Sequence, residues 1–478
     1  MAQDTALPPL SLKVKLAYGT GELAASIPAS IAAFFMLYFF STVAGLSPAL
    51  AGGVFLIGRI WDGFNDPLIG WLSDRTHSSL GRRYPWMLLG VLPLAILFAL
   101  LWIVPPLASE SGLFIYYVCI SLGLSAAMTA VQLPFTALAA ELSEDYDERT
   151  SLMGTKSAFS LAGSILGMGL SQLIFAYWPN PETSYLLLGV LSGCISILSI
   201  GICVLGTYRR YWQIQQYRRL GATVPRPTAN SPMAQLRGIL INPIFRTILG
   251  LYLCAWVGVQ ITAAMLPYFV DAWMRLPEIH FAQMALAVQS TAIVAILGWN
   301  WLGKRNDKRT IFLAGAPLAA LSLLGLILVQ PEQIGFMYIL GFFAGIGIAT
   351  LYMVPFAMLP DVIDLDELTT GQRREGLYFS AVVFLQKLGL AIALFMSGQI
   401  IDWTGFTANV ETQPDQALWA IRLLIGPIPA MMILGSLVFA LYYPISRQRH
   451  RQVLLQLQQR RQGYSRSPMD NLGPSHRH

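Results

Sequence analysis

Two carboxylates and one guanidinium stand in the middle of an apolar stretch of the chain. Residues 46–72 are long enough to cross a bilayer, yet they contain Arg59, Asp62 and Asp66. A charged side chain at that depth costs at least ~2.5 kcal/mol, so such groups usually face a polar cavity and have a function there. Because Asp62 and Asp66 are four residues apart, a helix places both on one face, with Arg59 one turn before Asp62.

The residues beside this pair supply further oxygen atoms. Pro67 has no N–H, so the carbonyl of Gly63 loses its helical partner, and Asn65 adds an amide group. Carboxylate, amide and carbonyl oxygens together suit a hard cation such as Na⁺, or a proton. The alternative is a buried Arg–Asp ion pair that only holds helices together, and the two roles can coexist. The pattern favours the cation site.

Composition indicates which elements must position these groups. The chain has 478 residues, of which 55% are hydrophobic and 12% charged, and its mean hydropathy is +0.57. Soluble domains carry about twice this share of charge. Apolar segments without strand-like alternation recur along the chain at residues 16–40, 46–72, 86–104, 113–140, 152–177, 185–206, 244–270, 281–302, 311–329, 334–359, 377–401 and 418–443. The sequence therefore predicts an all-α integral membrane protein with twelve transmembrane helices.

The polar loops give the orientation and the division of the chain. Lysine and arginine are concentrated in alternate loops, which the positive-inside rule assigns to the cytoplasm, together with both termini. We expect a multi-pass protein of the plasma (inner) membrane. The predicted parts are an N-terminal six-helix bundle, a central cytoplasmic loop, a C-terminal six-helix bundle and a cytoplasmic tail, at residues 1–207, 208–240, 241–446 and 447–478.

The two predicted bundles repeat one another. Leu-Pro-Phe at 133–135 in the fourth segment recurs as Val-Pro-Phe at 354–356 in the tenth. Repeated halves of this kind are typical of secondary transporters that rock about a site near the middle of the membrane. The chain has no Walker loop, nucleophile elbow or metal motif, so we expect neither an enzyme nor an ATP-driven pump.

At this point the chain resembles a known family over nearly its whole length. The run Arg-Ile-Trp-Asp-Gly-Phe-Asn-Asp-Pro at 59–67 is similar to a motif of the glycoside–pentoside–hexuronide:cation symporters, a family with the major facilitator fold. Supporting matches lie at 15–19, 74–75, 81–86 and 365–371. The resemblance implies alternating-access symport of a sugar or glycoside with Na⁺ or H⁺. It implies no cofactor besides that ion, and we expect a monomer with no partner besides the substrate and the lipid bilayer. The basic residues lie in short loops between the spans, so the net charge of +6 does not indicate a nucleic-acid partner.

The resemblance also implies roles for single residues. It places the coupling cation at Asp62, Asn65, Asp66 and Thr129, with Arg59 as an ion-pairing neighbour on the same helix. It places the substrate near five residues, namely Glu22, Ser26, Gln132, Lys156 and Lys387. The two lysines can also pair with the carboxylates of Asp62 and Asp66 when no cation is bound.

Some positions depart from the family pattern. Melibiose permease, its best-known member, has aspartates at the positions of Ser26 and Gln132, so the galactoside preference does not transfer, although Glu22 could substitute. The run Met-Leu-Pro-Asp-Val-Ile-Asp at 358–364 is similar to a branch that carries lysophospholipids. A cation-coupled carrier of a lysolipid-like amphiphile, and a sensor that does not transport, therefore stay open as alternatives.

Charged residues also collect at the predicted cytoplasmic ends of the helices. They occupy equivalent positions in the two halves, so we expect ion pairs between the halves that close a gate on the cytoplasmic side. The residues of this predicted gate are Asp74, Arg75, Arg82, Arg83, Glu141, Arg149, Asp361, Asp364, Arg373 and Arg374. The five histidines are scattered in loops and tail without ligand spacing, so no metal other than the coupling Na⁺ is expected.

Overall fold

The computed structural model is built from helices throughout the residues it describes, namely 9–107, 109–143, 145–178, 180–220, 238–372, 374–408, 410 and 412–465. The first group of helices, called the N-half below, comprises α1 (Leu12–Thr20), α2 (Leu23–Tyr38), η1 (Phe39–Val43), α3 (Pro48–Arg75), α4 (Tyr84–Leu101), α5 (Glu110–Leu142), α6 (Tyr146–Tyr177) and α7 (Pro181–Leu220). The second, called the C-half, comprises α9 (Pro243–Tyr268), η2 (Phe269–Trp273), α10 (Ile279–Gly303), α11 (Lys308–Gly325), η3 (Leu326–Leu328), α12 (Ile334–Thr370), α13 (Glu375–Trp403), α14 (Asp415–Ile425) and α15 (Pro427–Tyr442). A tail helix, α16 (Arg447–Ser465), follows the C-half.

These elements supply the number of membrane spans that the sequence predicts. Eleven stretches of the described chain are long and apolar enough to cross a membrane, each being one helix or a run of consecutive helices. The twelfth is α3, which has 28 residues but carries the charged groups at 59, 62 and 66 in its middle. The expected multi-pass membrane protein is thus confirmed. α7 continues to Leu220, which lies within the range predicted as the central loop.

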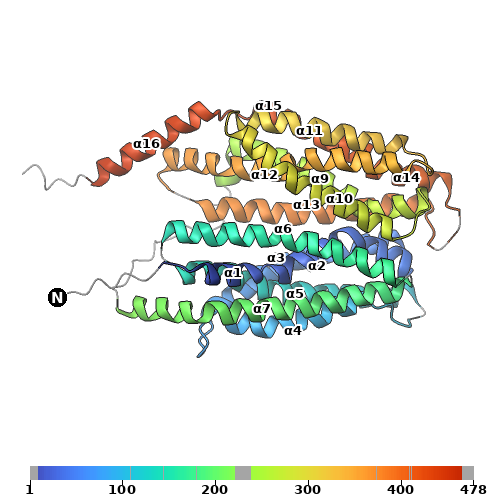
Figure 1. Cartoon of the computed structure of the whole chain (residues 1–478), viewed down its shortest axis with the longest axis horizontal. Helices are drawn as coiled ribbons and strands as arrows, with labels where there is room; N and C mark the ends of the chain where they lie inside the picture. The colour runs from blue at the N-terminus through green and yellow to red at the C-terminus, as the bar shows by residue number, and fades with distance from the viewer. Residues whose placement is uncertain are drawn as a thin grey trace, which may run out of the picture.

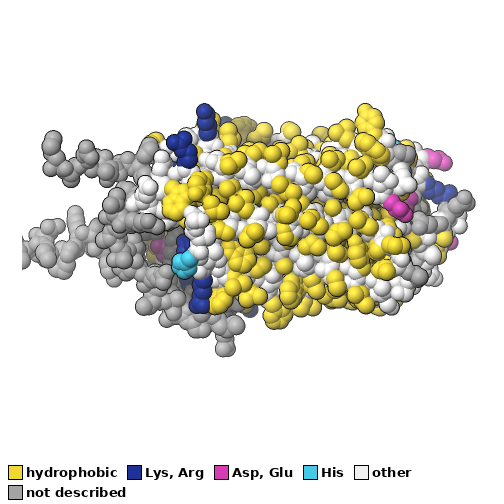
Figure 2. All heavy atoms as spheres, turned by 90° about the horizontal axis from the view of Figure 1, so that it is seen from below, with side chains coloured by type: hydrophobic (Ala, Val, Ile, Leu, Met, Phe, Trp, Pro, Cys, Tyr) yellow, Lys and Arg dark blue, Asp and Glu magenta, His cyan; other side chains and the backbone are white. Residues whose placement is uncertain are grey.

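The helices form two bundles that lie side by side. Figure 1 shows α1–α7 in one bundle and α9–α15 in the other, with the start of α1 and the helix α16 at the same end of the molecule. We call this the terminal end, and it is the end predicted to be cytoplasmic. On the face shown in Figure 2, hydrophobic side chains cover the length of the molecule, and charged ones gather near its two ends. This distribution suits a protein whose middle faces lipid.

The two halves also match in their local distortions. The first membrane-length segment of each half ends in a π-helix, η1 in the N-half and η2 in the C-half. Short π-helical segments within helices often mark functional sites. Both segments lie at the end opposite the terminal end, where the bundles meet.

The two halves are in direct contact at that opposite end. The Tyr38 hydroxyl of the N-half donates a hydrogen bond to Asp271 Oδ2 at 3.0 Å, and the Tyr268 hydroxyl of the C-half donates to the Leu37 carbonyl at 3.0 Å. The rings of Phe35 and Phe281 pack beside them, with centroids 5.3 Å apart. Aromatic packing and paired polar groups therefore seal the two halves together at this end.

Two glycines allow α3 and α13 to approach each other closely below this seal. A Cβ added at Gly398 would lie 2.3 Å from the Pro48 carbonyl oxygen, and one at Gly52 would lie 2.9 Å from the Phe395 Cα. Side chains at these positions would push the two helices apart. The close approach matters because α3 and α13 carry the charged groups near the middle of the molecule.

At the terminal end, the predicted gate residues pair within their own halves. In the N-half, Arg82 and Arg83 both bind Glu141, at 2.7 and 3.0 Å, and Arg83 also binds Asp74. Arg149 donates to the Ser143 carbonyl at 2.7 Å, and the Arg75 guanidinium lies 4.1 Å from the centroid of the Trp71 ring.

The C-half has a corresponding set of contacts. Lys308 binds Asp361 at 2.7 Å, and Arg374 binds Asp366 at 2.7 Å. His450 of the tail helix α16 reaches Asp364 at 3.1 Å. Arg373 lies outside the described residues.

The expected ion pairs between the halves are thus not found among the described gate residues. The hydrogen bonds, ion pairs and ring contacts that join described residues of the two halves lie at the level of Asp66 or nearer the opposite end. The physical reason is the conformation, which is closed at the opposite end, so that the charges at the terminal end find partners within their own halves.

Candidate functional site

The charged face of α3 points at helices from both halves. Asp62 is 5% exposed, and its two carboxylate oxygens have different partners. Arg59 donates to Oδ2 at 2.8 Å, while the Ser125 hydroxyl of α5 donates to Oδ1. The predicted pairing of Arg59 with Asp62 is therefore present, and it occupies only one side of the carboxylate.

Asp66 lies one turn further along α3 and is held in the same two-sided way. The Thr129 hydroxyl of α5 donates to Oδ1 at 2.7 Å, and Lys387 Nζ of α13 donates to Oδ2 at 2.7 Å. Lys387 Nζ also lies 3.5 Å from Asp62 Oδ2. A lysine of the C-half thus bridges both carboxylates of the N-half.

Asn65 lies beside the carboxylates on α3. Its side chain is 3% exposed, and its Nδ2 atom has no hydrogen-bond partner among the described residues. An unsatisfied buried amide is costly, so a position of this kind is rarely kept for packing alone. Rotation of the amide exchanges its nitrogen and oxygen, so the side chain can present an acceptor to a cation.

A second polar group lies within the N-half. Gln132 of α5 donates to Glu22 Oε2 at 3.0 Å, and Lys156 Nζ of α6 lies 3.7 Å from the same oxygen. Lys156 also donates to the Thr136 hydroxyl at 3.0 Å. Three of the five predicted substrate residues therefore come together here.

The other two predicted substrate residues lie elsewhere. The Ser26 hydroxyl donates to the backbone carbonyl of Glu22 at 3.0 Å, within its own helix. It also packs on Gly163 of α6, where an added Cβ would lie 2.0 Å from Ser26 Oγ. Ser26 thus serves helix packing in this conformation. Lys387 lies with the α3 carboxylates.

Sequence reasoning missed two residues that the structure brings into these networks. Ser125 contacts Asp62, and its signal was its position four residues before Thr129, on the same face of α5. His450 contacts Asp364 from the tail helix, and its position in a polar, glutamine-rich segment gave no such signal.

A polar cavity of about 770 Å³ opens at the opposite end, above the seal between the halves. Its lining includes Tyr38 and Glu182 of the N-half, and Asp271, Arg275 and Glu278 of the C-half. The Glu278 carboxylate has no hydrogen bond or ion pair among the described residues. Burial, and then the neighbouring charge of Asp271, raises the pKa of Glu278 from 4.5 to about 7.

This raised pKa predicts a pH-dependent seal. If opening hydrates Glu278, its pKa returns to the ordinary value in the open form, so protonation favours the closed form. The equilibrium constant for closure is then highest below pH 4.5 and falls as the pH rises to about 7. It falls by up to about tenfold per pH unit. In a background without native cysteines, labelling of Ser41→Cys by a membrane-impermeant thiol reagent should speed up over this range.

The control for this experiment is Thr407→Cys, an exposed loop position that corrects for the pH dependence of the reagent itself. Glu278→Gln should remove the pH dependence of Ser41→Cys labelling. An unchanged pH dependence in Glu278→Gln would show that another group controls the seal.

Comparison with known proteins agrees with this architecture. Residues 17–447 match the model of a family described as MFS/sugar transport protein. Among solved structures, the nucleoside transporter NupG superposes with a TM-score of 0.62 at 15% identity, covering 91% of this chain and 98% of its own. That likeness supports the fold alone, and it confirms the predicted major facilitator fold.

Relatives of this chain extend over nearly all of it. An uncharacterised symporter of Synechocystis sp., sll1374, is 38% identical over 97% of this chain and 99% of its own length. The sphingosine-1-phosphate transporter MFSD2B of Xenopus tropicalis is 26% identical, covering 94% of this chain and 91% of its own. The putative glycoside/cation symporter YagG of Escherichia coli is 27% identical, covering 94% of this chain and 95% of its own length. The chain therefore belongs to the MFS/sugar transport protein family, as a multi-pass transporter of the glycoside–pentoside–hexuronide:cation symporter type and not an enzyme.

Proposed function

We propose that this protein couples the movement of a sugar or glycoside to that of Na⁺ or H⁺ across the plasma membrane, by alternating access, with both termini in the cytoplasm. One observation carries the proposal. Lys387 of the C-half binds Asp66 of the N-half at 2.7 Å and lies 3.5 Å from Asp62. A movable positive charge from the opposite bundle thus occupies a carboxylate pair that a free cation could also occupy.

This arrangement links ion binding to the relative position of the two halves. Without the ion, Lys387 neutralises the carboxylates and holds α13 against α3. A cation bound at Asp62 and Asp66 weakens that pairing, because it satisfies the same charges. In the proposed cycle, Asn65 and Thr129 complete the cation site. With this orientation, the proposal assigns the conformation seen here, closed at the end opposite α1 and α16, to the inward-facing state.

The polar group of the N-half supports a hydroxylated substrate. Glu22 offers a carboxylate that accepts a hydrogen bond from the Gln132 amide at 3.0 Å, and the Lys156 ammonium lies 3.7 Å from the same oxygen. Hydrogen bonds to charged groups are the stronger ones, so sugar hydroxyls would bind best to Glu22 and Lys156. In this scheme Glu22 supplies the acidic contact that the aspartates provide in melibiose permease.

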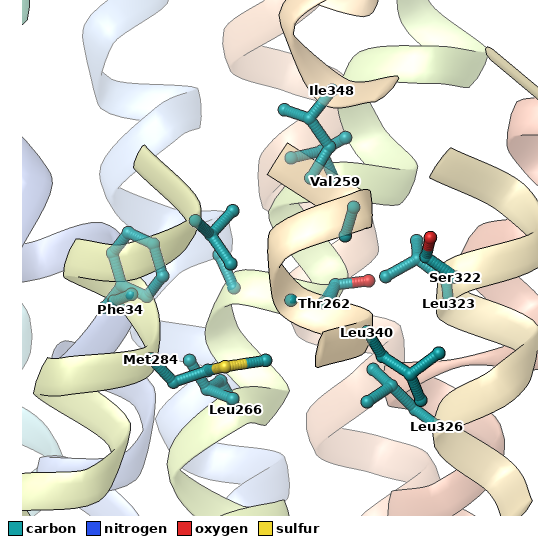
Figure 3. A pocket seen from close by; sticks show the side chains of 15 residues that line it. Phe34, Val259, Thr262, Leu266, Met284, Ser322, Leu323, Leu326, Leu340 and Ile348 are labelled. Carbon is teal, nitrogen blue, oxygen red and sulfur yellow. The ribbon is translucent and has the colours of Figure 1, made fainter. Parts of the chain in front are cut away.

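A lysolipid-like substrate is the second candidate, because MFSD2B at 26% identity is about as similar to this chain as YagG at 27%. The apolar cavity between α2 and α9–α12, shown in Figure 3, bears on this choice. Its volume is about 60 Å³, and its lining includes Phe34, Met284 and Leu326. That space equals about two water molecules, which is small against an acyl chain. This cavity is too small for an acyl chain or for a sugar in this conformation, so it favours neither candidate.

A substrate panel tests the proposal. Thermal unfolding of the purified protein should be measured with glycosides, pentoses and a lysolipid, each with and without Na⁺ and at two pH values. We expect a glycoside to raise the melting temperature, and the cation to increase that effect. Glu22→Gln should weaken glycoside binding about tenfold, as for loss of a charged hydrogen-bond partner, whereas Glu332→Gln in an exposed turn should not.

Two outcomes would point elsewhere. Stabilisation by the lysolipid alone would assign the protein to the amphiphile carriers. Binding without transport in reconstituted vesicles would favour a sensor.

A further inference from the structure

Helices α3 and α5 run parallel and meet in a regular register. Asp62 contacts Ser125 and Asp66 contacts Thr129, so both contacts join residues that are 63 positions apart in the chain. Each pair lies one helical turn from the other. The hydroxyls of Ser125 and Thr129 therefore form two successive steps beside the two carboxylates.

The same register shows where this polar strip ends. One turn toward the terminal end, a Cβ at Gly70 would lie 3.9 Å from Leu133 Cδ1, which is an apolar contact. One turn toward the opposite end, Gly58 has open space beside its Cα and Ser121 Oγ is buried without a partner among the described residues. Within this register, hydroxyls thus meet carboxylates only at Ser125 and Thr129.

The carboxylates present distinct faces to their neighbours. In both Asp62 and Asp66, Oδ2 receives a cationic donor, from Arg59 and Lys387 respectively. In both, Oδ1 receives a hydroxyl of α5. The side facing α5 therefore holds four oxygen atoms and no positive charge, whereas the other side is already occupied by two cations.

We propose that Ser125 is a further ligand of the coupling cation and makes the site select Na⁺ over a proton. This inference rests on the cation coupling proposed above. A hydroxyl that donates its proton to Asp62 still has oxygen lone pairs, so Ser125 Oγ can bind a cation held at Oδ1. A metal cation needs several oxygens at once, whereas a proton needs one carboxylate oxygen. Loss of Ser125 should therefore weaken Na⁺ binding more than proton binding.

The test compares two serines on the same face of α5. Na⁺ is titrated at constant ionic strength and fixed pH against the melting temperature of the full-length protein, for wild type, Ser125→Ala, Ser125→Thr and Ser121→Ala. We expect Ser125→Ala to raise the Na⁺ concentration at half-effect about tenfold, in line with the loss of one ligand hydrogen-bonding group. Ser125→Thr, which keeps the hydroxyl, and Ser121→Ala should stay close to wild type.

A second measurement separates ligation from folding. The pH dependence of the melting temperature without Na⁺ should be nearly the same in Ser125→Ala and wild type, because proton binding does not need the hydroxyl. Equal Na⁺ dependence in Ser125→Ala and Ser121→Ala would overturn the inference and leave cation coupling intact. A wild type that responds to pH but not to Na⁺ would also overturn it. A wild type that responds to neither ion would contradict the proposed function as well.

Discussion

Replacing Asp66 by Asn is expected to abolish accumulation of substrate driven by a cation gradient. The change keeps the shape of the side chain and removes the charge that Lys387 and the cation share. Asp62→Asn should act in the same way, because Asp62 is the second carboxylate within reach of Lys387. Exchange of substrate down its own gradient should survive in part, since Glu22, Gln132 and Lys156 are left in place. Uptake and exchange into reconstituted vesicles measure the two activities separately.

The matched control is Asp402→Asn, which removes a carboxylate from the opposite end of α13. It should leave gradient-driven uptake intact. Binding of the cation to the folded protein should raise the melting temperature of wild type and of this control, but not of Asp62→Asn. Undiminished Na⁺- and H⁺-driven uptake in both α3 variants would show that the carboxylates have only a structural role.

Lys387→Gln should make the stability of the protein depend more steeply on Na⁺ or low pH. Without the lysine, Asp62 and Asp66 repel each other, and a bound cation relieves that repulsion. Deleting one partner of a fully buried ion pair costs ~3–5 kcal/mol. The Lys387 side chain is 33% exposed, so we expect a smaller loss of about 1–3 kcal/mol in cation-free buffer. Denaturant unfolding with and without Na⁺ gives the two values.

A double-mutant cycle then tests whether the lysine and the carboxylates act together. Adding Asp62→Asn to Lys387→Gln removes one of the two repelling charges, so the double variant should recover part of the lost stability. A coupling free energy near zero would mean that Lys387 stabilises the protein by packing alone. A loss that is insensitive to Na⁺ would lead to the same conclusion.

Much of the fold could be predicted because each membrane span appears in the sequence as a long run of apolar residues. Length and hydrophobicity indicate each helix, and even α3 could be recognised as a span despite its charges. The pairing of Lys387 with the α3 carboxylates could be anticipated from family resemblance. Periodicity alone could not predict it, because the two residues are more than 300 positions apart and belong to different bundles.

Other features could not be predicted for physical reasons. The gate residues were expected to pair between the halves, but a sequence is the same in every conformation, and this conformation pairs Glu141 with Arg82 and Arg83. Ser125 was missed because serine is a common, small residue within membrane helices. Its spacing from Thr129 places it on the same face of α5, but Ser121 shares that face. Only the axial register of α5 against α3 decides which of these serines meets Asp62.

The balance of charges in the middle of the molecule has an electrical consequence. The carboxylates of Glu22, Asp62 and Asp66 are matched in number by three cationic side chains, those of Arg59, Lys156 and Lys387. In the proposed cycle, reorientation of the empty protein then carries no net charge of these groups across the membrane, and the transmembrane voltage neither drives nor hinders it. One bound Na⁺ or H⁺ gives the loaded form a single positive charge. Moving that charge across a membrane potential of 100 mV changes the free energy by ~2.3 kcal/mol. With an uncharged substrate, the membrane potential therefore acts on only one of the two reorientations and gives the cycle its direction, even where the ion is equally concentrated on both sides.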